Sequence, residues 1–419
     1  MDVELITIGD ELLLGFTIDT NAAHLARELA SIGIGIRRRA TVGDTAEDIA
    51  RAVGEAIGRT GAVITTGGLG PTSDDLTKPS IASIFGRSMR LDEEHVAWME
   101  QRWQQRFNRR MPESNRAQAM LPEGATKLVN NHGSAPGIWL EDEQGRWVAM
   151  LPGVPREMRG MLADTLLPRL RELVGAGGVP TVVRSRTLRT TGVAESLLAD
   201  QLDPILPSLG RISLAYLPAP DGVDLRITVR DVSASEADEA LDAAASIVRE
   251  RLGRSIYGEG STDLASVVLD RCREQRLTIA VAESCTGGLL GARLTSIPGS
   301  SDVVLGGVIA YANDVKRDML GVDEAELVRY GAVSEPVVRQ MAEGVRSRTG
   351  ASIGIGITGV AGPGGGTQEK PVGTVWIGIA LPRATKALQV RLIGDREEIR
   401  RRATQSALEL VRRGLAGED

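Results

Sequence analysis

Residues 278–288 of this 419-residue chain read TIAVAESCTGG. The segment joins a short apolar run, typical of a buried strand, to a polar turn that ends in paired glycines. A helical pattern follows over about residues 288–296. Strand, glycine turn and helix in immediate succession are typical of an open α/β sheet, in which ligands bind beyond the carboxyl ends of the strands. We therefore expect an α/β domain around this turn, with the turn at a functional site.

The alternation of strand and helix patterns predicts three domains in the chain. Residues 1–172 read as a three-layer α/β domain, 181–257 as a small α+β domain, and 263–419 as a three-layer α/β/α domain. A glycine-rich segment at 175–180 indicates a linker, and a second boundary is expected at 258–263. The middle segment has the order strand, helix, strand, strand, helix, strand.

The expected elements of the two larger domains follow from their hydrophobic periodicity. In the first domain we predict strands at 3–8, 34–42 and 62–66, helices at 20–30, 46–59 and 92–110, and a hairpin of 138–140 with 147–151. In the last domain we predict strands at 278–282, 303–311, 352–358, 373–381 and 386–394, and helices at 264–276, 288–296, 314–329, 335–349 and 396–413. Alternating Ile and Gly residues at 353–357 predict a strand with one apolar face and one face open to a close neighbour.

Composition excludes several classes of function. The chain carries 49 Lys and Arg against 55 Asp and Glu, a net charge of -6, which argues against broad electrostatic binding of nucleic acid. No apolar run reaches the roughly 18 residues of a membrane span, and the acidic start MDVELITIGD does not resemble a secretory signal. Two cysteines cannot form a disulfide framework. We expect a cytoplasmic protein with small-molecule ligands and no membrane partner.

The turn after residue 283 offers two candidate nucleophiles, Ser284 and Cys285. Ser284 or Thr286 would lie at a helix N-terminus, where free N–H groups and the helix dipole favour developing negative charge, unless these hydroxyls only cap the helix. A nucleophile needs a base, and the three histidines of the chain, at positions 24, 95 and 132, all precede this domain. Neither a Ser-His-Asp triad nor a Cys-His dyad can form within the domain, which leaves lysine.

Lys316 is the candidate base. It follows the strand predicted at 303–311, in the segment YANDVK at 311–316. To accept a proton at neutral pH its pKa must fall from about 10.4 through burial or nearby positive charge. The alternative is an ordinary solvated lysine at the start of a helix.

A glycine-rich loop follows a third strand. Residues 358–366 read TGVAGPGGG, and such a loop lets backbone N–H groups converge on an anion such as phosphate. The alternative is a flexible surface loop. Three loops that follow three strands are expected to converge on one pocket.

The N-terminal domain has a comparable turn. Residues 65–77 read TTGGLGPTSDDLT, in which Gly67, Gly68 and Gly70 can admit a phosphoryl group and Asp74 or Asp75 can hold a divalent cation. Acidic residues also follow two neighbouring strands, at 9–11 (GDE) and at 43–44 (GD). The alternative is a helix N-terminus with acidic caps.

Four separated motifs give the last domain a specific resemblance. AESCTGG at 282–288, YANDVK at 311–316, GAVSEP at 331–336 and GVAGPGGGTQEKPVGTVW at 359–376 resemble the C-terminal domain of the CinA family, the nicotinamide mononucleotide deamidases. The resemblance implies a Ser/Lys amidohydrolase that needs no cofactor, with Ser284 as nucleophile, Lys316 as base, Tyr311 as an assisting hydroxyl and Thr286 at the substrate. Substrate contacts are then expected from Cys285, Gly287, Gly288, Thr358, Gly359, Ala361, Gly362 and Gly364.

The first domain resembles the MoaB/MogA molybdopterin-binding fold, and more closely the N-terminal domain of the CinA family. TIGDELLLG at 7–15, DTNAAHLARELASIG at 19–33 and PGVPREM at 152–158 carry this resemblance with the glycine turn. Leu69 stands where the molybdopterin branch has threonine. The resemblance implies a pyrophosphatase that splits ADP-ribose with Mg, Mn or Co, with Asp44, Asp74 and Asp75 as metal ligands. Substrate contacts are then expected from Gly67, Gly68, Gly70, Thr72 and Thr77.

The middle domain resembles the KH-like domain that joins the other two in this family. An RNA-binding KH domain needs a Gly-x-x-Gly clamp with basic neighbours, which 181–257 lacks, and acidic residues are frequent there. We therefore expect a homodimeric enzyme of pyridine nucleotide recycling that binds no nucleic acid. The alternatives are a non-catalytic scaffold that binds nucleotide or molybdopterin, and an RNA-binding protein acting through the KH-like domain.

Overall fold

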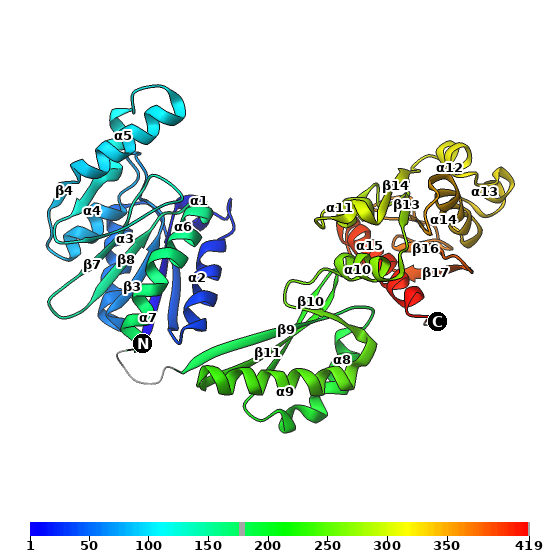
Figure 1. Ribbon diagram of the computed structural model, residues 1–419, viewed down its shortest axis with the longest axis horizontal. Coiled ribbons are helices and arrows are strands. Elements are labelled where there is room, and N and C mark those ends of the chain that lie inside the picture. The colour runs from blue at the N-terminus through cyan, green and yellow to red at the C-terminus, as the bar shows by residue number, and fades with distance from the viewer. Residues whose placement is uncertain (176–180, 418–419) are drawn as a thin grey trace. The chain divides into compact units, whose positions relative to one another are not determined.

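The computed structural model describes residues 1–175 and 181–417. The described chain divides into two compact units, one of 1–184 with 229–239 and the other of 185–228 with 240–419. Figure 1 shows the elements of each. The linker expected at 175–180 lies, apart from residue 175, outside the described residues. No helix in the described chain is long and apolar enough to cross a membrane.

The N-terminal domain has a six-stranded sheet with the order β2-β1-β3-β8-β7-β6. The strands are β1 (Asp2–Ile8), β2 (Gly35–Val42), β3 (Ala62–Thr66), β6 (Thr126–Leu128), β7 (Gly137–Glu141) and β8 (Trp147–Leu151). The first four in the sheet are parallel, and β7 pairs with β8 as the predicted antiparallel hairpin. A separate two-stranded sheet joins β4 (Met89–Leu91) to β5 (Met120–Pro122).

Helices cover both faces of this sheet, which gives the predicted three layers. They are α1 (Asp10–Leu13), α2 (Thr20–Ser31), α3 (Ala46–Thr60), α4 (Thr77–Ile84), α5 (Glu93–Phe107), α6 (Pro155–Met161) and α7 (Leu167–Gly175). Leu5 points into the core shared with α2, α6 and α7, whereas Ile6 points into the core shared with α3 and α4. This division follows from the period of two along a strand.

The middle domain is a four-stranded sheet with the order β10-β11-β9-β12 and two helices. Its elements are β9 (Val182–Thr190), α8 (Glu195–Leu202), β10 (Ser213–Ala219), β11 (Gly222–Val232), α9 (Ala234–Leu252) and β12 (Ile256–Glu259). This is the predicted order of elements. The β10–β11 hairpin turns at Pro220 and Asp221, which are residue types that favour turns.

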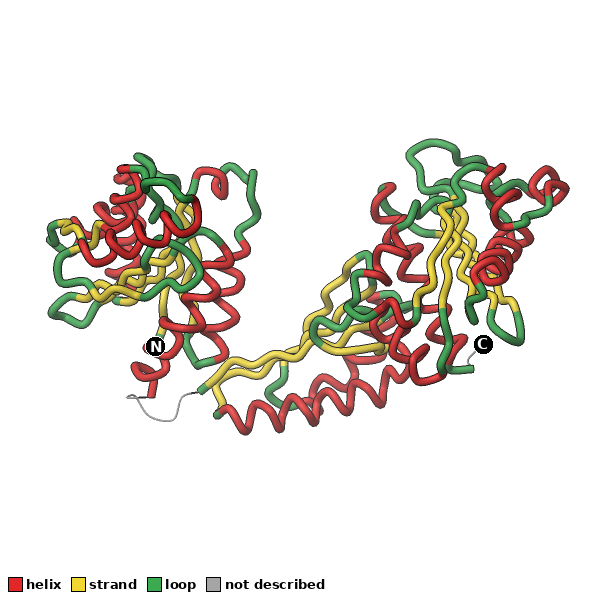
Figure 2. The backbone as a smooth tube through the Cα atoms, turned by 45° about the horizontal axis from the view of Figure 1, so that its top comes forward, coloured by secondary structure: helices red, strands yellow, loops and turns green. Residues whose placement is uncertain are grey.

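The C-terminal domain has a five-stranded sheet with the order β14-β13-β15-β16-β17. Its strands are β13 (Ile279–Glu283), β14 (Val304–Ile309), β15 (Ile353–Gly359), β16 (Thr374–Ala380) and β17 (Thr385–Arg391). The first three are parallel and the last two antiparallel. Figure 2 shows the strands of this sheet between two layers of helices.

One helical layer contains α10 (Leu264–Gln275), α11 (Leu289–Thr295) and α15 (Arg396–Leu415), and the other contains α12 (Asn313–Leu320), α13 (Glu324–Tyr330) and α14 (Glu335–Thr349). The single helix predicted over 314–329 is wrong, because Gly321 ends α12 in a left-handed conformation and Asp323 caps a new helix. The close neighbour expected beside Gly354 is α14, since a Cβ on this glycine would lie 2.0 Å from the carbonyl oxygen of Ala342.

Candidate active site

The Ser284 hydroxyl lies at the carboxyl edge of the C-terminal sheet. Strand β13 ends at Glu283, and the Ser284 N–H still donates to the carbonyl oxygen of Ile357 at 2.9 Å. The serine backbone is therefore held by the neighbouring strand β15, and its side chain starts the turn before α11. Ser284 is 9% exposed.

Lys316 reaches Ser284 from the first turn of α12. Its Nζ lies 3.2 Å from Ser284 Oγ, 2.8 Å from the carbonyl oxygen of Ala310 and 3.1 Å from that of Tyr311. The lysine is only 1% exposed. The predicted Ser–Lys pair is thus in direct contact, although 32 residues separate the two in sequence.

Burial lowers the pKa of Lys316, because a charged ammonium loses its hydration inside the protein. None of the three atoms that it contacts carries a negative charge. A neutral amine has two N–H bonds and one lone pair. Two carbonyl oxygens and one hydroxyl match that set, with the lone pair available to the serine proton. The contacts therefore suit Lys316 as a base.

Cys285 does not suit the alternative role of nucleophile. Its side chain is buried, and burial raises the pKa of the thiol to about 12. The reactive form of cysteine is the thiolate, which is scarce at neutral pH with such a pKa. Ser284, in contact with Lys316, is the better candidate for the nucleophile.

Two arginines of α15 contact loops of the candidate site. Arg400 donates to the carbonyl oxygen of Thr286, at 3.2 Å from Nε and 2.6 Å from Nη2. Arg396 donates to the carbonyl oxygen of Gly362 at 2.6 Å and to the Tyr311 hydroxyl at 3.1 Å. The three loops that were expected to converge are therefore tied to one helix.

The other residues predicted for this site differ in their exposure and in their contacts. Tyr311 is 62% exposed, and its hydroxyl lies on Arg396. The Thr358 hydroxyl donates to the carbonyl oxygen of Ala332 at 2.9 Å, so this threonine holds a neighbouring loop. Gly359 ends β15, Ala361 is buried and Gly364 is exposed. Thr286 is fully buried, and its hydroxyl has no hydrogen-bond partner among the described residues.

The start of α11 differs from both expectations for it. Neither Ser284 nor Thr286 caps the helix, which begins after Gly288 without a side-chain cap. Its first N–H groups are also not free, because the buried carboxylate of Glu283 accepts from Gly288, Leu290 and Gly291. Sequence reasoning missed Glu283, as it missed Arg396 and Arg400. For the two arginines, spacing by four on one helix was the available signal.

Two backbone donors remain beside the nucleophile. The Gly287 N–H donates to the Ser284 carbonyl oxygen at 3.1 Å and the Gly288 N–H to Glu283. In the described chain, the N–H groups of Cys285 and Thr286 donate to no backbone carbonyl oxygen. These two are the candidates for an oxyanion hole.

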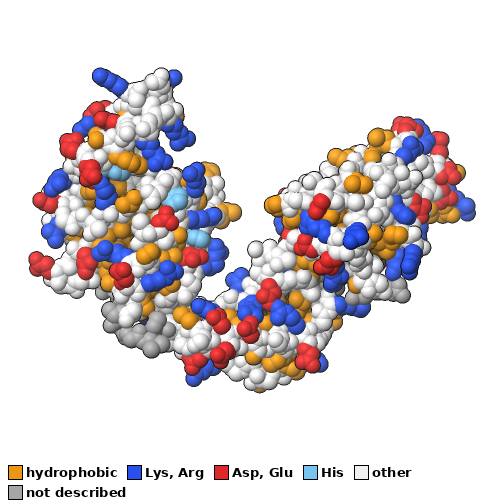
Figure 3. Space-filling model, viewed as in Figure 1, with side chains coloured by type: hydrophobic (Ala, Val, Ile, Leu, Met, Phe, Trp, Pro, Cys, Tyr) orange, Lys and Arg blue, Asp and Glu red, His pale blue; other side chains and the backbone are white. Residues whose placement is uncertain are grey.

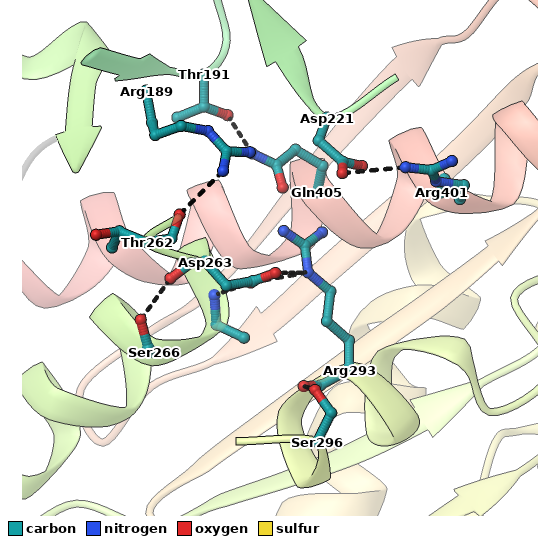
Figure 4. A network of polar contacts seen from close by, with 11 residues as sticks. Arg189, Thr191, Asp221, Thr262, Asp263, Ser266, Arg293, Ser296, Arg401 and Gln405 are labelled. Atoms are coloured by element: carbon teal, nitrogen blue, oxygen red, sulfur yellow. Dashed lines mark hydrogen bonds and ion pairs between the residues drawn. The ribbon is translucent and has the colours of Figure 1, made fainter. Parts of the chain in front are cut away.

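The same helix α15 also binds the middle domain, as Figure 4 shows. Arg401 pairs with Asp221 at the tip of the β10–β11 hairpin at 3.2 Å, and Gln405 donates to the Thr191 hydroxyl at 3.0 Å. Beside them Arg293 of α11 pairs with Asp263 at 3.0 Å. A cavity of about 650 Å³ lies between α11, α15 and the hairpin tip.

A second candidate site lies in the N-terminal domain. A pocket of about 580 Å³ is lined by the glycine turn 67–70, by acidic residues of three loops and of the helices α1 and α6, and by two buried amides. The acidic lining residues are Glu11, Asp19, Asp44, Asp74, Asp75 and Glu157. Asn21 and Gln118 are both more than nine-tenths buried, and among the described residues each leaves its amide oxygen without a partner.

The predicted metal ligands are not equivalent in this pocket. Asp75 holds the glycine turn, since it accepts from the N–H of Gly70 at 2.7 Å and from the N–H and hydroxyl of Thr72 at 2.8 and 2.5 Å. The buried Thr77 hydroxyl donates to the carbonyl oxygen of Gly67 at 3.0 Å. Asp44 accepts one backbone N–H, that of Asp10 at 3.1 Å, and a hydrogen bond from Thr72 lowers the pKa of Asp74.

Burial raises the pKa of Asp44, and the negative charges of Asp10, Glu11 and Asp74 add to this effect. Within the described residues, no group of three or more His, Cys, Asp or Glu side chains has the spacing of a metal site. A Mg²⁺ site commonly uses one or two carboxylates together with substrate phosphates and water. Asp44 and Asp74 fit a site of that type, whereas Asp75 is committed to the turn.

Charges of both signs are interspersed on the visible face of each unit (Figure 3).

The domains match three family models in order. Residues 4–172 match the probable molybdopterin binding domain, 185–258 the damage-inducible protein CinA KH domain, and 261–415 the CinA C-terminal domain. The chain therefore combines a molybdopterin-binding type of fold, a KH-like domain and a CinA C-terminal domain.

Full-length relatives identify the family. A CinA-like protein of Gemmatimonas aurantiaca is 62% identical over 418 residues, which cover 100% of this chain and 97% of that protein. A CinA-like protein of Salinibacter ruber is 45% identical over 417 residues, covering 99% of this chain and 100% of the relative. This protein belongs to the CinA family.

A solved structure also resembles the chain. The competence/damage inducible protein CihA from Agrobacterium tumefaciens is 41% identical, with a TM-score of 0.36, and the match covers 36% of this chain and 93% of that one. The homodimer expected from the resemblance stays a prediction.

Proposed function

We propose that the C-terminal domain hydrolyses the carboxamide of nicotinamide mononucleotide with Ser284 as nucleophile and Lys316 as base. The observation that carries the proposal is the buried contact of 3.2 Å between Lys316 Nζ and Ser284 Oγ. Because the other two contacts of Nζ are carbonyl oxygens, the lysine has the surroundings of a neutral amine. The choice of nicotinamide mononucleotide as the substrate is based on the four sequence motifs of the family.

The reaction follows from the positions of these groups. Lys316 takes the proton of Ser284 Oγ, which attacks the carboxamide carbon. The negative charge on the carbonyl oxygen is stabilised by the free N–H groups of Cys285 and Thr286, and one such donor is typically worth about 10²–10³ in rate. Lys316 returns the proton to the leaving nitrogen, the C–N bond breaks and ammonia departs. Water then attacks the ester, which releases nicotinate mononucleotide and restores Ser284.

The test is ammonia release by the purified chain and by the variants Ser284→Ala and Lys316→Ala. We expect both variants to lose activity by about 10³-fold or more, as removal of a nucleophile or its base does in other hydrolases. Cys285→Ala is the matched control and should remain active. Wild-type turnover by Ser284→Ala would disprove the assignment.

A second function is proposed for the N-terminal pocket, the hydrolysis of ADP-ribose with a divalent cation. The glycine turn beside Asp44 and Asp74, together with two unpaired amide oxygens, favours a phosphorylated ligand with N–H donors such as an adenine nucleotide. Asp44 and Asp74 would hold the cation, which supplies charge to neutralise phosphate oxygens. Asp75 and Thr72 keep the turn open for it.

AMP release from ADP-ribose, measured separately with Mg²⁺, Mn²⁺ and Co²⁺, tests this second function. We expect activity that depends on a cation and falls at least tenfold in Asp44→Asn. No release with any of the three cations would leave this domain as a binding or scaffold domain, which is the alternative stated above.

A further inference from the structure

Glu283 precedes the candidate nucleophile and is 1% exposed, yet it has no basic partner among the described residues. Its two carboxylate oxygens accept three backbone N–H groups instead. These belong to Gly288 at 3.0 Å, Leu290 at 3.0 Å and Gly291 at 2.7 Å. The side chain therefore reaches across the loop 284–287 and binds the residues that follow it.

This contact closes the catalytic loop into a ring. One side of the ring is the end of β13 and the other is the first turn of α11, with Ser284 between them. A carboxylate is needed here because all three partners are donors, and an amide would place an NH₂ group against one of them. The contact also leaves the Cys285 and Thr286 N–H groups as the unused donors of the loop.

The neighbouring contacts show that the loop geometry is set from several sides. The Ala310 N–H donates to the carbonyl oxygen of Glu283 at 2.8 Å, and the carbonyl of Ala310 is one of the oxygens that holds Lys316. The backbone of Glu283 is therefore joined through one residue to the base, while its side chain holds the far end of the nucleophile loop. A small displacement of Glu283 would move both members of the pair.

We propose that Glu283 is a positioning residue of this amidase site. It acts on the reaction through the loop 284–288, by keeping Ser284 Oγ on Lys316 Nζ and two loop N–H groups free for the oxyanion. The inference rests on the proposed Ser/Lys function. It assigns the carboxylate no part in proton transfer.

The test is Glu283→Gln in the full-length chain, with ammonia release from nicotinamide mononucleotide as the readout. We expect kcat to fall about 10²-fold, because displacement of a catalytic group by about 1 Å has this effect, whereas KM should stay within about threefold. The pH dependence of kcat/KM should keep its shape, because the base is unchanged. A folded variant with kcat within threefold of the wild type would overturn the proposal.

Asp323→Asn is the matched control. Asp323 caps α13 of the same domain through the Ala325 N–H at 2.8 Å, but it does not contact the catalytic loop. Its loss should leave kcat within about twofold while weakening the helix cap. If Glu283→Gln does not fold, Glu283→Asp is the second variant. It keeps the negative charge on a side chain that is shorter by one methylene, and its kcat should lie between that of the wild type and the roughly 10²-fold loss expected for Glu283→Gln.

The labelling rate of Ser284 by a fluorophosphonate probe separates failure of this inference from failure of the proposed substrate. Labelling reports the reactivity of the serine without any nucleotide. If the wild type releases no ammonia but Glu283→Gln is labelled at least tenfold more slowly, the positioning role holds and the substrate is wrong. If ammonia is released and both proteins are labelled at equal rates, the positioning role is wrong.

Discussion

Two buried lysines have different hydrogen-bond partners, and these partners indicate different roles. Lys316 and Lys78 are both almost fully buried and both donate to backbone carbonyl oxygens. Lys78 donates to the carbonyls of Ala117 and Gln118, at 2.6 and 3.2 Å, and so ties α4 to the segment before β5. Lys316 has a serine hydroxyl as its third partner. The first lysine is therefore structural and the second is a candidate base.

The pH profile of the amidase should report Lys316. Burial lowers the pKa of this lysine, and only its neutral form can accept the serine proton. We expect kcat/KM to rise with pH through that lowered pKa and then to level off, with the midpoint below the usual lysine value of about 10.4. Lys316→Arg should be inactive at every pH measured, because a guanidinium stays protonated.

Lys127→Arg is the control for this profile. Lys127 pairs with Asp92 in the N-terminal domain, and arginine keeps that pair. An unaltered profile is expected from it. If the rate fell with rising pH over the same range, a protonated lysine would be the active form and the proposed base would be wrong.

Lys78 should make the stability of the N-terminal domain depend on pH. Burial lowers the pKa of Lys78 from 10.5 to about 8, so between these values the folded domain binds fewer protons than the unfolded chain. Stability must then rise with pH in this window, and the full cost of the buried charge is present below pH 8. Relative to Lys78→Met, the wild-type domain should gain about 2 kcal/mol between pH 8 and 10.

Urea unfolding followed by tryptophan fluorescence measures this difference. Trp98, Trp103, Trp139 and Trp147 are four of the five tryptophans, and all lie in the N-terminal domain. If the free energy of unfolding depended on pH equally in the wild type and in Lys78→Met, the pKa of Lys78 would be the same in the folded and unfolded chain, and the prediction would be wrong.

At this scale, sequence reasoning was most informative where a residue type was absent. Without histidine after position 132, a lysine was expected as the base, and Nζ of the predicted Lys316 lies 3.2 Å from Ser284 Oγ. Glu283 could not be predicted in the same way. Its partners are backbone N–H groups, which every residue has, and only the folded turn brings three of them to one carboxylate.

Among the elements, α15 contacts both the candidate active site and the middle domain. Its first turns hold loops of the catalytic site through Arg396 and Arg400, and the next residues hold the middle domain through Arg401 and Gln405. The helix itself was predicted from its periodicity at 396–413. Its contacts were not, because they depend on how β17 and the loop after it place the helix against the sheet.

Adjacent arginines of α15 permit a matched comparison. Arg400→Ala removes two hydrogen bonds to the carbonyl oxygen of Thr286, so the loop beside Ser284 loses a support. We expect kcat to fall about tenfold, in keeping with the loss of a contact made by a charged donor group. Arg401→Ala breaks an ion pair with Asp221 whose arginine is 45% exposed, and the amidase should stay within about twofold. Equal losses in the two variants would mean that α15 acts as a whole rather than through Arg400.

For the whole molecule, the three domains followed from changes in pattern along the chain, since strand and helix alternation stops near residue 175 and returns near 264. The contents of the two sites followed only in part. In the N-terminal domain Asp44, Asp74 and Asp75 were all expected to be metal ligands. The carboxylate oxygens of Asp75 instead accept hydrogen bonds from the glycine turn. Sequence spacing cannot separate adjacent aspartates, because the turn decides which one faces inward.

The two proposed activities belong to different compact units, so single substitutions should separate them. Ser284→Ala should abolish ammonia release and leave AMP release from ADP-ribose within about twofold, because Ser284 and the N-terminal pocket share no residue. Asp44→Asn should reduce AMP release at least tenfold and leave ammonia release within about twofold. Both products can be measured in one reaction that contains the two substrates and a divalent cation. If Ser284→Ala also reduced AMP release severalfold in a folded protein, the two sites would be coupled, and the assignment of one independent activity to each unit would be wrong.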